Sequence, residues 1–191
     1  MVLTRARVAT AAGVALGVGL TSLMVVRTTQ AVFSGYSSTP SNTWATGGAT
    51  LSNDATASAV FSQANDGTLA GGQVLSRCIV VTYVGATTPA AVRLYATASG
   101  ALNSYLSLVV DQGSGTPGNG SCTGFSASSA GIYSGTVAGF ATAANAWGSG
   151  VGSWSPTVGA TMTYRFTVTV QNHPSAQNAT GSATFTWEAQ A

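Results

Sequence analysis

The sequence predicts an all-β protein, either a sandwich or a barrel. Apolar and polar residues alternate in several short segments, which is the pattern of strands that are buried on one face. Segments rich in Gly, Pro, Asn and Ser separate these runs, as expected for turns. The sequence shows no βαβ pattern, long amphipathic helix or heptad repeat. Roughly seven to nine short strands are expected, a number typical of sandwiches and barrels.

Residues 1–31 are expected to be a secretory signal helix that precedes the β domain. Arg5 and Arg7 give the positive start, and 8–26 is an uncharged run rich in Ala, Gly, Val and Leu. Small residues then favour cleavage between Ala31 and Val32. The alternative is an uncleaved leader that anchors the chain, since about 20 apolar residues can cross a bilayer. We therefore expect a secreted protein, located in an extracellular matrix or at the cell surface, with membrane contact only through an uncleaved leader.

The remaining residues, 32–191, are expected to form one domain. The clearest strand is 162–170, where Tyr164 and Phe166 belong to the apolar set. A second alternating strand is expected at 183–190, with Trp187 in its apolar set, and Tyr164 and Trp187 are both expected in the core. Shorter strands are expected at 50–52, 57–61, 78–84, 91–96 and 105–110. Turns or loops are expected at 65–67, 85–89, 113–120 and 172–181, and one helical turn within 140–147, whereas the rest of 124–156 shows no clear pattern.

The two cysteines, Cys78 and Cys122, are expected to form a disulfide. Outside the cytoplasm such a bond persists. It would close a loop of about 45 residues and stabilise the fold by roughly 4 kcal/mol in the chain-entropy model. The alternative is a reactive thiol. However, the chain has no CxxC motif, and nothing in the sequence links His173 to either cysteine.

Few side chains after residue 31 could carry chemistry. Charged residues make up 5% of the chain, against about 25% in ordinary proteins. The charged residues after residue 31 are Arg77, Arg93, Arg165, Asp54, Asp66, Asp111 and Glu188, and the single histidine is His173. Asp54 and Asp66 are interpreted as turn residues, and Arg165 and Glu188 are expected to pair across a sheet. We expect no enzyme activity, no cofactor or metal, and no nucleic-acid partner, since a basic footprint is absent.

Several segments resemble, in the same order, the TasA/camelysin family of exported biofilm-matrix proteins. The first is Ala31-Val32-Phe33-Ser34-Gly35-Tyr36, followed by 41–47 and 49–52. Further similar segments are 71–77, 80–95 and 178–189. The chain departs from the family at Gly71, where Pro is common, and is poorly matched over 113–160.

The resemblance implies a jelly-roll sandwich whose subunits assemble into extracellular fibres. In that family the N-terminal segment of one subunit completes a sheet of the next, which is a form of β-augmentation. The candidate donor strand lies within 31–38 and comprises Ala31, Val32, Phe33, Ser34, Gly35 and Tyr36. Copies of the same chain would then be the partners, and cleavage of the leader would license assembly.

Two other functions compete with this one. Some camelysin relatives are described as metallopeptidases, but a zinc site typically takes three protein ligands, and His173 is the single histidine. A carbohydrate- or cell-surface-binding module is the stronger rival, with matrix polysaccharide or cell wall as partner. Trp147 and Trp154 lie in a Gly/Ser-rich stretch and are expected to be an exposed pair that stacks on sugar rings. Asn119 and Asn178 each begin a glycosylation triplet, a pattern frequent in chains rich in Ser and Thr.

Overall fold

The computed structural model describes residues 33–34, 44–46, 49–55, 59–85, 88–89, 91–118 and 120–190. The expected signal helix, its cleavage site at Ala31 and Val32, and Gly35 and Tyr36 of the candidate donor strand lie outside these residues. Asn119 also lies outside them. Within the described residues, no helix has the length and apolar character needed to span a bilayer.

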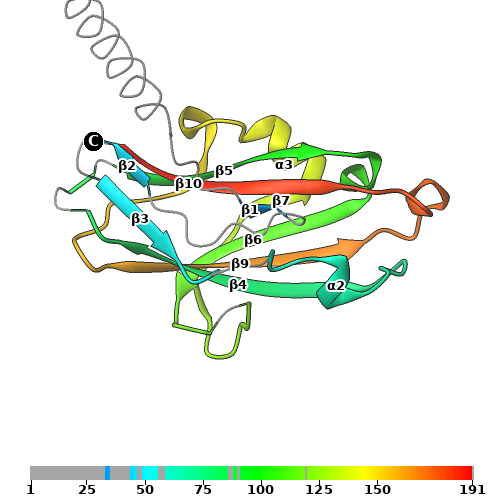
Figure 1. Ribbon diagram of the computed structural model, residues 1–191, viewed down its shortest axis with the longest axis horizontal. Coiled ribbons are helices and arrows are strands. Elements are labelled where there is room, and N and C mark those ends of the chain that lie inside the picture. Colours follow the sequence, from blue (N-terminus) through cyan, green and yellow to red (C-terminus); the bar gives the residue numbers. More distant parts are fainter. Residues whose placement is uncertain are drawn as a thin grey trace, which may run out of the picture.

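Two antiparallel sheets face each other and form a β-sandwich (Figure 1). The four-stranded sheet contains, in spatial order, β1 (Phe33–Ser34), β10 (Ser182–Gln190), β5 (Ala91–Ser99) and β8 (Val151–Trp154). The six-stranded sheet contains β2 (Trp44–Thr46), β3 (Ala49–Asn53), β4 (Val74–Tyr83), β9 (Thr161–Val170), β6 (Leu106–Ser114) and β7 (Ser126–Thr136). The predicted all-β sandwich is therefore confirmed.

The order of the strands is that of a jelly roll. Strands β4, β5 and β6 alternate between the sheets, β6 and β7 form a hairpin within one sheet, and β8, β9 and β10 alternate again. Eight strands, β1 and β4 to β10, are enough for this double-sheet arrangement. The β2–β3 hairpin extends the six-stranded sheet beside β4.

The core lies between the two sheets and is built from alternate residues of each strand. Phe185 and Trp187 of β10 point toward Tyr164 and Phe166 of β9, with ring centroids 4.6 Å apart for Phe166–Phe185 and 5.4 Å apart for Tyr164–Trp187. All four side chains are buried, so the sequence prediction for Tyr164 and Trp187 is confirmed. Such edge and tilted contacts between rings add to the free energy of burial.

A short helix closes one side of the sandwich. Helix α3 (Val137–Ala143) begins after Thr136, whose side chain accepts a hydrogen bond from the Gly139 N–H as an N-cap. Phe140 of α3 is fully buried against Tyr133 and Phe185. The helix begins three residues before the range 140–147 in which one helical turn was expected, and it overlaps that range at 140–143.

The strand predictions differ from the structure at 57–61, at the end of β6 and at β7. Residues 59–61 of the strand expected at 57–61 are not in a strand, and β6 continues to Ser114, into the loop expected at 113–120. Strand β7 falls in the stretch that showed no pattern. Its first half, 126–131, is exposed at every residue. Because neither face of that half is buried, no alternation of apolar residues is required, and periodicity cannot reveal the strand.

Candidate functional site: a sheet edge and an apolar groove

The described part of the candidate donor strand lies at the edge of the four-stranded sheet. Strand β1 pairs antiparallel with β10, with Phe33 opposite Phe185 and Ser34 opposite Thr184. On its other side β10 pairs with β5 over nine residues. Beyond 184–185, β10 has no described strand beside it on the β1 side. The described part of this first strand therefore covers only a short part of the edge.

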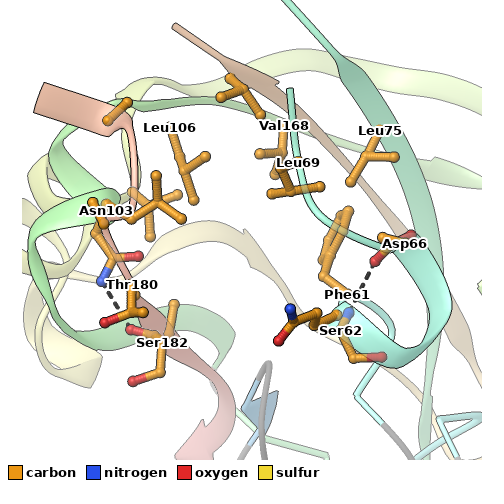
Figure 2. Close-up of a pocket in the computed structure, with 18 of the residues that line it drawn as sticks. Phe61, Ser62, Asp66, Leu69, Leu75, Asn103, Leu106, Val168, Thr180 and Ser182 are labelled. Carbon is orange, nitrogen blue, oxygen red and sulfur yellow. Dashed lines mark hydrogen bonds between the residues drawn. The ribbon is translucent and has the colours of Figure 1, made fainter. Parts of the chain in front are cut away.

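An apolar groove of about 380 Å³ opens between the two sheets, next to the start of β10 (Figure 2). Four leucines from different elements line it, together with side chains from β9, β10 and α3. The four are Leu69, Leu75, Leu102 and Leu106. The volume lies in the range of small-molecule sites, which are about 300–1,000 Å³ and mainly apolar.

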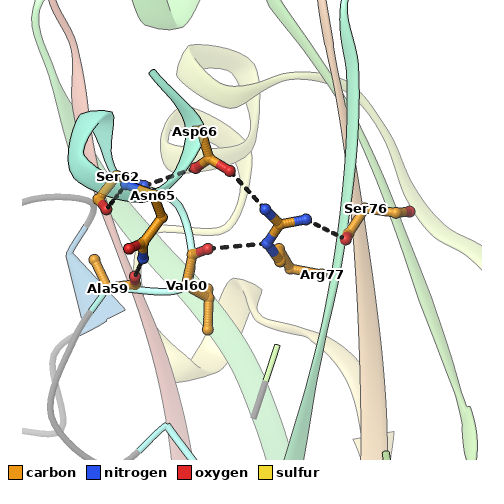
Figure 3. A network of polar contacts seen from close by, with 7 residues as sticks. All are labelled: Ala59, Val60, Ser62, Asn65, Asp66, Ser76 and Arg77. Atoms are coloured by element: carbon orange, nitrogen blue, oxygen red, sulfur yellow. Dashed lines mark hydrogen bonds and ion pairs between the residues drawn. The ribbon is translucent and has the colours of Figure 1, made fainter. Parts of the chain in front are cut away.

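One wall of the groove is fixed by a partly buried ion pair (Figure 3). The Asp66 carboxylate accepts from Arg77 Nη2 at 2.6 Å and from the Ser62 N–H at 2.9 Å. The Arg77 guanidinium also donates to the carbonyl oxygens of Val60 at 3.2 Å and Ser76 at 3.0 Å. Asp66 is the last residue of helix α2 (Gln63–Asp66), so the pair ties this turn to β4. Asp66 is thus more than the turn residue expected from sequence, since its side chain is 3% exposed.

The opposite wall is fixed by Asn103 of the 3₁₀ helix η1 (Ala101–Ser104). This asparagine is 2% exposed, and its Nδ2 donates to the Ser99 carbonyl at 2.5 Å and to the Ser182 carbonyl at 3.0 Å. A Cβ atom at Gly181 would stand 2.8 Å from Asn103 Oδ1, so the glycine makes room for the amide. Figure 2 shows Oδ1 turned toward the groove.

Cys78 and Cys122 form the expected disulfide, with Cα atoms 5.0 Å apart. Cys78 lies on β4 and is fully buried, and its N–H donates to the carbonyl of Gly120 at 3.3 Å. The bond therefore attaches the loop before β7 to the strand that carries Arg77. No described cysteine is free.

The two tryptophans proposed for ligand stacking lie on different faces of the four-stranded sheet. Trp154 on β8 pairs with Val92, a core residue, and packs against the core. Cross-strand partners share a face, so Trp154 faces inward. Trp147 instead lies under Arg93, with the guanidinium carbon 4.6 Å from the ring centroid. Both indoles are half-buried, and they do not form the shared exposed surface expected from sequence.

The expected pair between Arg165 and Glu188 is wrong, because the two residues belong to different sheets. Arg165 on β9 binds Asp111 on the neighbouring strand β6, with Nη2 2.7 Å from Oδ2. Glu188 on β10 accepts from the Tyr95 hydroxyl at 2.9 Å. Burial, and then this bond to Glu188, raise the pKa of Tyr95 to about 12.

The remaining acid is Asp54, at the end of β3. Burial raises the pKa of its carboxyl group, although the group accepts a hydrogen bond from the Val80 N–H at 2.8 Å. Among the described residues, no three His, Cys, Asp or Glu side chains gather as a metal site would require.

Comparisons with known proteins identify no relative of this chain. No family model matches the chain, and neither a curated protein nor a solved structure does. The resemblance to the TasA/camelysin family stays a prediction from short sequence motifs.

The residues that build the groove carried no sequence signal. The leucines come from separated segments, and Asn103 lies between strands without a motif around it. Asp66 and Arg77 are separated by a loop and the first residues of β4, so no helical or strand periodicity relates them. Only the packing of the two sheets brings these residues together.

Proposed function

We propose that the protein is an exported structural subunit that assembles with copies of itself by strand addition. The observation that supports this most directly is the position of β1. It is a two-residue strand at a sheet edge, and it directly follows the expected cleavage site. In the fibre, the N-terminal segment of one subunit would take this place on β10 of the next. Such an exchange of an identical element between copies is a low-cost route to assembly.

The register of β1 defines how a longer donor strand would pair. If the pairing of Phe33 with Phe185 continues toward Tyr36, Gly35 comes opposite Ala183. Side chains alternate across a strand, so Phe33 and Gly35 would share the face that carries Phe185. A small residue beside one aromatic residue suits a seam next to the large buried rings of β10.

The scarcity of charge supports the same proposal. A strand that joins another sheet gains affinity from main-chain hydrogen bonds and register from side-chain pockets. No charged residue occurs between Ala31 and Tyr36, so a donor strand would bring no unpaired charge into the seam. Matrix polysaccharide or cell wall would be a further partner of the assembled fibre.

Cleavage of the leader would control when assembly starts. While residues 1–31 remain attached, the donor segment is tethered at both ends. Once they are removed, it has a free N-terminus and can leave its own subunit. A mature form beginning at Val32 is therefore expected to form filaments visible by electron microscopy. The same form without residues 32–38 is expected to remain unassembled, and filaments from that truncated form would rule out this donor strand.

A mixing experiment tests the register directly. One batch of protein carries Ser34→Cys and a second carries Thr184→Cys, so a new disulfide can form only between two different subunits. Paired residues in antiparallel strands have Cα atoms about 4.5–5.5 Å apart, which a disulfide can bridge. Mixed fibres should give covalent dimers on a non-reducing gel.

The matched control for this experiment replaces Thr184→Cys by Thr97→Cys. Thr97 is the partner of Thr184 on the next strand, β5, and lies about 5 Å farther from β1. It should therefore give no dimers. Equal cross-linking of both mixtures, or cross-linking only inside single chains that carry both Ser34→Cys and Thr184→Cys, would contradict strand exchange.

A further inference from the structure

The groove described above brings together the described leucines that the core leaves partly uncovered. Three of the described leucines, Leu51, Leu94 and Leu108, are fully buried. The other four described leucines are only half-buried, and all four line the groove. Single exposed apolar side chains are common, whereas a concave cluster of them marks a binding site.

The walls of the groove are held in place by polar contacts that do not depend on a ligand. On one side the Asp66–Arg77 ion pair fixes α2 to β4. On the other side the Leu102 N–H donates to the Thr180 carbonyl at 3.1 Å, and Asn103 donates to two further carbonyls. A pre-formed cavity of this kind binds a ligand without first paying for the ordering of its walls.

The polar groups of the lining restrict the chemistry of the ligand. Both N–H groups of the Asn103 amide have acceptors, whereas no described residue donates to its Oδ1, which faces the groove. A ligand with one hydroxyl or N–H group would supply that donor. Asp66 is the one charged residue among the described lining residues, and it is an acid. An anionic ligand would therefore meet no positive charge in the lining and would lose its hydration.

We propose that this groove binds a neutral, mainly apolar small molecule whose single hydrogen-bond donor is received by Asn103 Oδ1. The groove adjoins the strand-exchange edge, because Ala183 and Phe185 of β10 also line it. Ligand binding nevertheless needs neither assembly nor a free N-terminus. Failure of the ligand test therefore leaves the fibre proposal standing, and the reverse also holds.

Three aromatic probes with one ring skeleton test the chemistry on the mature protein. N-phenyl-1-naphthylamine is neutral, has one N–H and fluoresces in apolar sites, so it should bind. Its ether analogue, 1-phenoxynaphthalene, lacks the donor and should compete about 2- to 10-fold more weakly, the range of one net hydrogen bond. The sulfonate 8-anilinonaphthalene-1-sulfonate should bind at least about tenfold more weakly, because its charge must be desolvated. Equal binding of the sulfonate, or no binding of the amine, overturns the proposal.

A pair of identical substitutions locates the site. Ala179→Phe places a ring at the rim of the groove and should weaken the amine at least about tenfold. Ala143→Phe places the same ring on the exposed end of α3, outside the groove, and should leave binding within about twofold of the unaltered protein. Equal effects of the two substitutions contradict the assignment.

A measurement on the unaltered protein tests the same contact without relying on the folding of any variant. The side-chain amide of Asn103 gives a pair of signals in a ¹⁵N–¹H spectrum. Addition of N-phenyl-1-naphthylamine should shift this pair, and the ether should shift it less. Binding of the amine without a change at Asn103 would overturn the role of its Oδ1.

Discussion

Removal of the Arg77 guanidinium tests how much the partly buried Asp66–Arg77 ion pair stabilises the fold. Arg77→Met keeps the apolar stem of the side chain and leaves the Asp66 carboxylate, 3% exposed, with only the Ser62 N–H as partner. Breaking a buried pair in this way typically costs 3–5 kcal/mol. Arg77 is itself 29% exposed, so water can reach the vacated space, and we expect a loss of about 3 kcal/mol, at the lower end of that range.

A second substitution distinguishes the contribution of the ion pair to stability from that of the other hydrogen bonds of Asp66. Asp66→Asn removes the charge, and its side-chain oxygen still accepts from the Ser62 N–H, so it should cost about 1–2 kcal/mol. In the double variant Arg77→Met/Asp66→Asn no buried charge is left unpaired. The double variant should therefore be more stable than Arg77→Met alone, which is a direct sign of coupling.

Urea unfolding followed by tryptophan fluorescence measures these free energies, and an unchanged m-value would show that the two-state comparison is valid. The expected loss corresponds to a fall in Tm of about 6–12 °C for a domain of this size. Arg93→Met is the matched control, since that guanidinium stacks on Trp147 and donates to the Gly148 carbonyl. It should cost about 1 kcal/mol. If Arg77→Met costs no more than Arg93→Met, the reasoning about the buried carboxylate is refuted.

Two further results are expected. Cys78→Ser/Cys122→Ser should lower the free energy of unfolding by roughly 4 kcal/mol, and a urea midpoint that is the same with and without reductant would contradict this. Tyr95 has a folded-state pKa of about 12, above the usual value of about 10, so its stabilising contribution is complete below pH 10 and is lost as the pH rises through 12. Tyr95→Phe should remove a tyrosinate absorbance step near pH 12, and Glu188→Gln should move that step to lower pH. Identical titration curves for all three proteins would contradict an effect of the Tyr95–Glu188 contact on the pKa of Tyr95.

Alternation of side chains predicted the strands that are buried on one face. Strand β9 begins one residue before the predicted segment and ends with it, and β10 also begins one residue early. Strand β7 escaped prediction because its first half is exposed on both faces. A strand segment that is exposed on both faces does not require alternating apolar and polar residues, so its sequence need not show that alternation.

Periodicity predicts which face a residue occupies, but it does not predict the neighbour across that face. Arg165 and Glu188 were both expected on polar faces of their strands, and both are, yet β9 and β10 belong to opposite sheets. Arg165 pairs instead with Asp111, which stands directly opposite it on β6. The groove escaped prediction for the same reason, because its leucines become neighbours only when the two sheets pack.

The order of the strands also has a consequence for the time course of folding. Among the described pairings, β2–β3, β3–β4 and β6–β7 join strands that follow one another in the sequence, and the other five are between distant segments. Phe33 and Phe185, for example, are about 150 residues apart, and a fold with so many distant pairings forms slowly. Neither sheet can be completed before β9 and β10 have been synthesised. A newly made chain would thus remain open for a comparatively long time, which would be compatible with the export that we propose.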